Sequence, residues 1–224
     1  HSLTRAAGGD AVTAVADMDA LWRLNESLRD DPELLSQLFS VAILRVQAAV
    51  LRQLGGVGPE WLDRLAGVDV RHRMHQALDC QNRRILAAVD TWGTDPLAVV
   101  CRPLGLLSVA DMSRDLSREI EQLAGLEFLC DRDLTGFAEA RTSPSWWNPD
   151  RATTLLPDLA NTVPRFARLE VDLELTRRIL ARRATLASGR LGLASAEIVS
   201  KACPGDRWIE TVGPDGSVTI ALDR

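Results

Sequence analysis

The sequence predicts a mainly α-helical protein, an irregular multi-helix bundle that ends in a short C-terminal β-hairpin. Two patterns carry this prediction. Apolar residues recur at three- and four-residue spacing over most of the chain, and alternating residues flank a Pro-Asp-Gly turn near its end. With 224 residues, of which 46% are hydrophobic, the chain can bury a core without help from a metal or a disulfide.

The first part of the chain predicts four helices. The first covers Ala11 to Arg29, where the apolar residues fall on one face. Asp31-Pro32-Glu33 then supplies a cap, a proline for the first turn and an early acid, so a second helix follows and runs to Leu54. A short helix covers Pro59 to Gly67, and a fourth, amphipathic helix covers Val70 to Trp92.

The second helix is apolar on nearly every side, so we expect it at the centre of the bundle with neighbours around it. Polar side chains nevertheless interrupt it, namely Gln37, Arg45, Gln47, Arg52 and Gln53. We therefore predict a core helix and no transmembrane segment in this chain.

The second part of the chain predicts further helices and the hairpin. Ser108 can cap a helix that continues towards Ala140, and a weaker helix follows Asn148-Pro149-Asp150. The last long helix begins at Pro164 and ends near Ser188, and the strands 208–212 and 217–222 flank the turn. We divide the chain into a helical body, 1–163, and a long helix with the hairpin, 164–224, packed together as one domain.

The charge distribution bears on the kind of partner. A net charge of −5 argues against a nucleic-acid binder, whose affinity depends on neutralising phosphates. Arginines are concentrated between Pro164 and Arg190. One interpretation is that they lie on a solvated face of a helix, with an ion pair between Glu174 and Arg178. The other is contact with an acidic partner or an anionic surface, for which Arg178 and Arg182 are the candidate residues.

Four cysteines leave the redox state open: Cys80, Cys101, Cys130 and Cys203. They form no CxxC pair and no zinc spacing, so they are compatible with two disulfides in any of three connectivities, or with four buried thiols. Cys203 lies just before the hairpin, and we predict that it forms a disulfide that ties the hairpin to the helical body.

One group of residues has the spacing of a metal site. His72, His75 and Asp79 stand at i, i+3 and i+7 of one predicted helix, so they share a face and could offer three ligands to a divalent cation. The alternative is that they are solvated residues, because the apolar residues of this helix lie on its opposite face.

The pair Trp146-Trp147 lies in a loop rich in Ser, Pro and Asn. Its rings could form a stacking platform for a sugar or for a partner's apolar side chain, or they could fold back into the helical core. The phosphate-binding, dinucleotide-binding and serine-hydrolase motifs are missing, so we name no catalytic residue and no cofactor, and the sequence favours a protein that is not an enzyme.

The C-terminal part carries a resemblance. A long helix is followed by Gly189-Arg190-Leu191-Gly192, then by 202–208 and a hairpin with Pro214-Asp215-Gly216. This arrangement resembles the end of exported bacterial proteins of unknown function, some of which are pseudopilin-like, with a helix followed by a small sheet. The resemblance implies a periplasmic, cell-envelope or secreted location and transfers no catalytic residue. It does not include the N-terminal hydrophobic helix of pseudopilins.

These patterns together predict a non-catalytic envelope or secreted protein that binds a protein partner or assembles with itself. A metal-dependent enzyme using His72, His75 and Asp79, and a helical carrier of a small ligand, are the alternatives. The chain begins at His1, as expected of a processed protein that has lost an N-terminal signal or anchor, or of a fragment with the remnant of a tag.

Overall fold

A computed structural model describes residues 11–54, 57–90, 159–188, 196–213 and 218–223, together with residues 113, 114, 117, 118, 120 and 121. Within these residues, five helices and a three-stranded antiparallel sheet follow one another along the chain. The predicted class, mainly α with a C-terminal hairpin, is confirmed.

The helices lie close to the predicted ranges because their apolar periodicity is strong. They are α2 (Ala11–Arg29), α3 (Leu34–Gln53), α4 (Glu60–Ala66), α5 (Val70–Asp90) and α9 (Leu159–Ala187). The last of them begins upstream of Pro164, which lies inside it. The proline removes one backbone hydrogen bond, and burial of the neighbouring Val163 offsets this loss.

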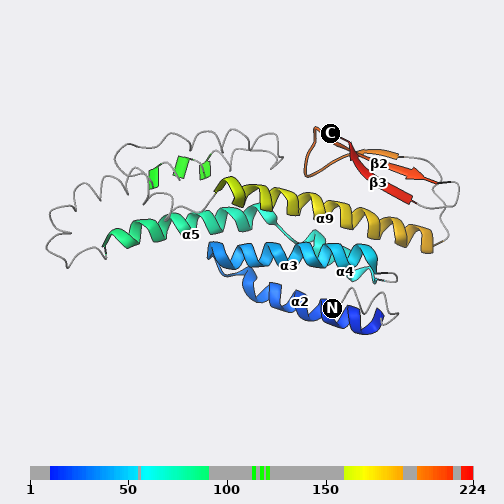
Figure 1. The fold of residues 1–224 in the computed structure, drawn as a ribbon, viewed down its shortest axis with the longest axis horizontal. Coiled ribbons are helices and arrows are strands. Elements are labelled where there is room, and N and C mark those ends of the chain that lie inside the picture. The colour runs from blue at the N-terminus through cyan, green and yellow to red at the C-terminus, as the bar shows by residue number, and fades with distance from the viewer. Residues whose placement is uncertain are drawn as a thin grey trace.

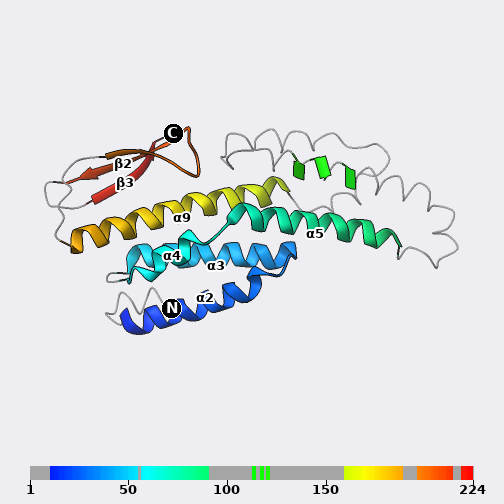
Figure 2. The same ribbon diagram turned by 180° about the vertical axis from the view of Figure 1, so that it is seen from behind.

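Three helices, α2, α3 and α9, lie side by side, with the sheet beyond α9 (Figures 1 and 2). Helix α3 contacts α2, α9 and α5, and α9 also contacts α4 and α5. Helix α3 therefore lies between α2 and α9, with α5 packed against both α3 and α9 and α4 packed against α9.

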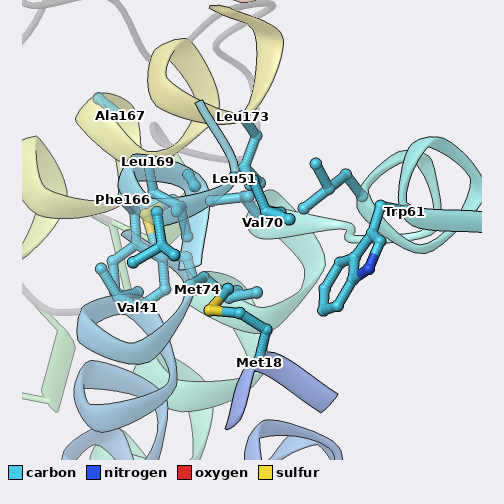
Figure 3. Packing of buried hydrophobic residues seen from close by; sticks show 14 of the residues in the cluster. Met18, Val41, Leu51, Trp61, Val70, Met74, Phe166, Ala167, Leu169 and Leu173 are labelled. Carbon is cyan, nitrogen blue, oxygen red and sulfur yellow. The ribbon is translucent and has the colours of Figure 1, made fainter. Parts of the chain in front are cut away.

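The hydrophobic core forms where these helices meet. Met18 of α2, Leu51 of α3, Trp61 of α4 and Met74 of α5 converge with the side chains of α9 (Figure 3). Phe166 of α9 is fully buried in the same cluster. The core thus draws on every described helix, and no single pair of helices would bury it alone.

A row of polar side chains on α3 joins it to α2. Gln37 Nε2 donates to the carbonyl oxygens of Leu28 at 2.9 Å, in the last turn of α2, and of Asp31 at 2.5 Å, just beyond it, where carbonyls lack helical i+4 partners. Ser40 Oγ donates to Asn25 Oδ1 at 2.5 Å, and Gln47 Nε2 donates to the Met18 carbonyl at 3.1 Å. These bonds fix the register of the two antiparallel helices.

Helix α3 is joined to α9 by charged groups. Asp172 accepts from Arg45 at 3.0 Å and from Arg52 at 3.4 Å. Arg183 donates to the carbonyl oxygens of Leu54 at 2.7 Å and Arg52 at 2.5 Å at the end of α3. A basic side chain from a neighbouring helix therefore caps the C-terminus of α3.

The sheet has the order β1 (Ala196–Val199), β2 (Arg207–Val212), β3 (Val218–Asp223). The predicted hairpin is confirmed, with Trp208 opposite Leu222 and Glu210 opposite Ile220. Strand β1 was not predicted from the sequence, because its four residues show no alternation and it is defined only by pairing with β2. Trp208 is fully buried whereas Ile220 is half-buried, so β2 supplies the main buried side chain of the sheet.

Two leucines on opposite sides of α3 test how the helix is buried. Leu44 is fully buried, and we expect Leu44→Ala to lower the free energy of unfolding by about 2 to 5 kcal/mol, because it leaves a cavity. Leu35 is 63% exposed, so Leu35→Ala should change that free energy by about 0.5 kcal/mol at most. Urea unfolding of both variants at low protein concentration measures the difference. Equal losses would contradict the burial described for α3.

Candidate functional site

An apolar stripe runs along the side of α3 that points away from the core. Leu35, Phe39 and Val46 are 63%, 58% and 54% exposed, and Ala42 between them is exposed as well. Their spacing of four, three and four residues places all four side chains on one side of the helix. The expectation that α3 has neighbours all around it is therefore wrong for the part of the chain that the structure describes.

The stripe has charged borders. Arg45 lies at its α9 side, in an ion pair with Asp172. Near its N-terminal end, Glu33 pairs with Arg84 of α5 at 3.1 Å. No charged residue stands on the stripe itself, so these four positions form an apolar surface bordered by ion pairs, the composition typical of a protein-binding patch.

By length and composition α3 would also be long and apolar enough to cross a membrane, a test that core helices of globular proteins pass too. In this structure one side of α3 packs against α2, α5 and α9. The stripe is therefore the exposed side of a packed helix.

A second group of residues attaches the sheet to α9. The Glu174 carboxylate accepts from the amides of Lys201 at 2.9 Å and Ala202 at 3.0 Å, and from Ser200 Oγ at 2.7 Å. Arg178, one turn along α9, donates to the same carboxylate at 2.8 Å. Glu174 is almost fully buried, so the connection between β1 and β2 wraps around a buried carboxylate.

The electrostatics of this group follow from its donors. Burial alone would raise the pKa of Glu174, but the hydrogen bonds from the two amides, the Ser200 hydroxyl and Arg178 outweigh burial and lower the pKa to about 2. The carboxylate is therefore charged under all ordinary conditions. It acts as a fixed structural anion, since a group of this kind is poorly suited to exchanging protons near neutral pH.

The arginines expected to contact a partner, Arg178 and Arg182, lie on α9. Arg178 binds Glu174, and its guanidinium carbon lies 5.7 Å from the centre of the Trp208 ring. Arg182 lies one turn further on and is half-buried. The structure thus gives Arg178 a role inside the fold, holding the sheet on α9.

The three residues with metal-site spacing, His72, His75 and Asp79, all lie on α5. His72 and Asp79 are exposed, and burial lowers the pKa of the half-buried His75. Among the residues that the structure describes, no group of three or more His, Cys, Asp or Glu side chains is arranged to hold a metal ion. The first turn of α5 is capped instead by Asp69, which accepts from the His72 amide at 2.9 Å.

The cysteines differ in state. Cys203 is in a disulfide bond, and Cys80 is a free thiol. The candidates Cys101 and Cys130, and the aromatic pair Trp146-Trp147, lie outside the described residues.

No family model, no curated protein and no solved structure matches the sequence or the fold. The candidate sites therefore rest on the geometry described above.

Sequence reasoning missed both the stripe and the role of Glu174. The stripe had a signal, because Gln37, Ser40 and Gln47 share one side of α3 and mark it as the side bonded to a neighbour. Leu35, Phe39, Ala42 and Val46 on the other side are apolar and carry no such mark. The pair of Glu174 with Arg178 at i+4 was predicted and is present, but the bonds from 200–202 had no local signal because that segment lies far along the chain.

Replacing the buried carboxylate tests its structural role. Near neutral pH we expect Glu174→Gln to lower the free energy of unfolding by about 3 kcal/mol, since the pKa falls from 4.5 to about 2 on folding. The folded-state pKa lies below the unfolded one, so this stabilisation is complete above about pH 4.5 and is lost as the pH falls towards 2. Urea unfolding across that range measures it.

Glu60→Gln, at an exposed site on α4, is the matched control. Its free energy of unfolding should fall with decreasing pH as it does in the unmodified protein. If Glu174→Gln shows the same acid dependence as the unmodified protein, the hydrogen bonds to Glu174 do not stabilise the fold.

The state of the cysteines can be measured directly. In protein denatured without a reductant, an alkylating reagent should modify Cys80 and leave Cys203 unmodified, because of these two described cysteines Cys80 is the free thiol and Cys203 is in a disulfide. Peptide mass spectrometry measures the alkylation of both cysteines. Cys203→Ser should lower the free energy of unfolding by about 2 to 4 kcal/mol, as is typical when a native disulfide is lost. Alkylation of Cys203 before reduction would rule out the bond.

Proposed function

We propose that the protein is a non-catalytic binding or assembly protein of the bacterial cell envelope or extracellular space, and that the apolar stripe on α3 is its contact surface. The observation that carries the proposal is the exposure of Leu35, Phe39 and Val46, each more than half exposed on one regular helix. Large apolar side chains that gather on one side of a helix are typical of surfaces that bind another helix.

The disulfide supports the proposed location. Disulfides persist in the periplasm and outside the cell and are rare in the reducing cytosol, so the bonded Cys203 favours an exported protein. The resemblance of the C-terminal helix and hairpin to exported bacterial proteins points to the same location.

Several buried polar groups of the described residues hold the fold together, and this supports a binding role over a catalytic one. Glu174 and Arg178 are occupied in holding the sheet, and the buried Arg73 donates to Ser40 Oγ at 2.7 Å beside the α2–α3 contact. Groups that fix elements in this way are not available to take part in a reaction. The apolar stripe, in contrast, is exposed and free to contact a partner among the described surfaces.

Photo-cross-linking in the native cell tests the proposal. A photoreactive amino acid in place of Phe39 should give a discrete cross-linked species on a denaturing gel, because the side chain projects from the proposed contact surface. The same amino acid at Gln76, exposed on α5, is the matched control and should give none. Fractionation of the same cells shows whether the protein is outside the cytoplasm.

Absence of any adduct at position 39, or identical adducts at positions 39 and 76, would contradict a specific contact through the stripe. Recovery of the protein in the cytoplasmic fraction would contradict the proposed location.

A further inference from the structure

The stripe on α3 has the repeat of a two-helix contact. Its exposed or half-buried positions follow one another at intervals of four and three residues over most of the helix: Leu35, Phe39, Ala42, Val46, Ala49 and Gln53. Alternating steps of four and three residues, seven residues for every two steps, keep one side of a helix facing a second helix along its length. The repeat therefore specifies a helix as the occupant of the stripe.

The order of large and small side chains points to a particular helix. We propose that a second copy of this chain packs α3 against α3 in antiparallel orientation, with the two-fold axis at Ala42. This inference rests on the function proposed above and names the partner. Around Ala42, the antiparallel arrangement sets Phe39 of each copy opposite Val46 of the other and Leu35 opposite Ala49, so large residues face smaller ones. The small Ala42 at the axis allows the two helices to approach closely.

A parallel pairing would be less favourable. It would place each Phe39 against the other Phe39 and each Ala42 against the other Ala42, with crowding at one level and a gap at the next. The arrangement of side-chain sizes thus selects the antiparallel dimer.

The charges at the two ends of the stripe are complementary in the same orientation. The N-terminal end carries Asp30, Asp31 and Glu33; Arg84 pairs with Glu33, and the neighbouring Arg29 pairs with Glu26 of α2. The C-terminal half carries Arg45 and Arg52, which share the single carboxylate of Asp172. Antiparallel packing brings the acidic end of one copy to the basic end of the other, whereas parallel packing brings like charges together.

The contact is small. Each copy contributes one helix face with three large apolar side chains, less than the area of a permanent dimer interface. The dimer should therefore dissociate on dilution, and its formation should depend on protein concentration.

Sedimentation equilibrium of the purified full-length chain, with its disulfide intact, measures this association. The unmodified protein should change from the 24.5 kDa monomer to a species of twice that mass as the concentration rises. Phe39→Glu should raise the dissociation constant at least about tenfold, because it places a charge in the centre of an apolar contact. Gln76→Glu adds the same charge on the exposed side of α5 and should leave the constant unchanged. Thermal unfolding of both variants checks that they are folded.

Disulfide trapping tests the orientation. After mild oxidation, Ala42→Cys should give a covalent dimer, because this residue meets its own copy at the axis. Leu35→Cys should give none, since Leu35 faces Ala49 of the other copy, and mixing Leu35→Cys with Ala49→Cys should restore the covalent dimer. The parent chain, oxidised in the same way, is the control for its own cysteines. A covalent dimer with Leu35→Cys alone would overturn the antiparallel arrangement.

The outcomes also separate this inference from the proposed function. A protein that remains monomeric at all concentrations, yet cross-links through position 39 to a different protein in the cell, overturns self-association and leaves the binding role intact. A protein that is monomeric and gives no adduct at position 39 overturns both. Equal dissociation constants for Phe39→Glu and Gln76→Glu would show that any dimer forms through another surface.

Discussion

The structure depends on the burial of one side of α3, a helix with apolar residues on nearly every side. Helices α2, α5 and α9 cover one side of it, and the hydrophobic core forms where they meet. The covered side is distinguished from the other by its polar contacts, because Gln37, Ser40 and Gln47 find partners on α2. Buried polar groups that are satisfied in only one arrangement favour that arrangement over slipped alternatives. The apolar side that remains has no such partners, and it is the side that the protein exposes.

The sheet is attached to α9 mainly by polar contacts and not by a shared apolar core. A small three-stranded sheet has little core of its own, so its position on α9 depends on specific contacts. The Glu174 carboxylate provides them by gathering two amides, one hydroxyl and one guanidinium from both sides of the junction. Cys203 adds a covalent bond next to the same junction. The carboxylate therefore attaches the sheet to α9, and the disulfide lies beside this attachment.

The sequence predicted those parts of the fold that depend on local spacing. The ranges of α2 and α3 and the presence of the hairpin follow from the apolar period and from turn signals that act within a few positions. The predicted cap was wrong in detail, because α3 begins at Leu34 with Glu33 as its N-cap and not at Pro32 after Asp31. Strand β1 and the role of Glu174 depend on residues far apart in the chain, which no local pattern reports. The exposure of the stripe was not predicted for a related reason. Periodicity shows that a residue such as Phe39 is apolar, but it does not show how many neighbours the helix will have.

The same contacts that hold α3 in the fold make its exposed side suitable for binding. Arg183 caps the last carbonyls of α3, and Gln37 and Gln47 fix its register on α2, so the helix is held in place before any partner arrives. A partner that binds Leu35, Phe39 and Val46 therefore does not have to order the backbone, and most of the free energy of apolar burial is available for association. A flexible segment with the same side chains would lose much of that free energy on binding. The rigidity of α3 thus allows a contact of a few side chains to be specific, and it explains why the stripe lies on this helix.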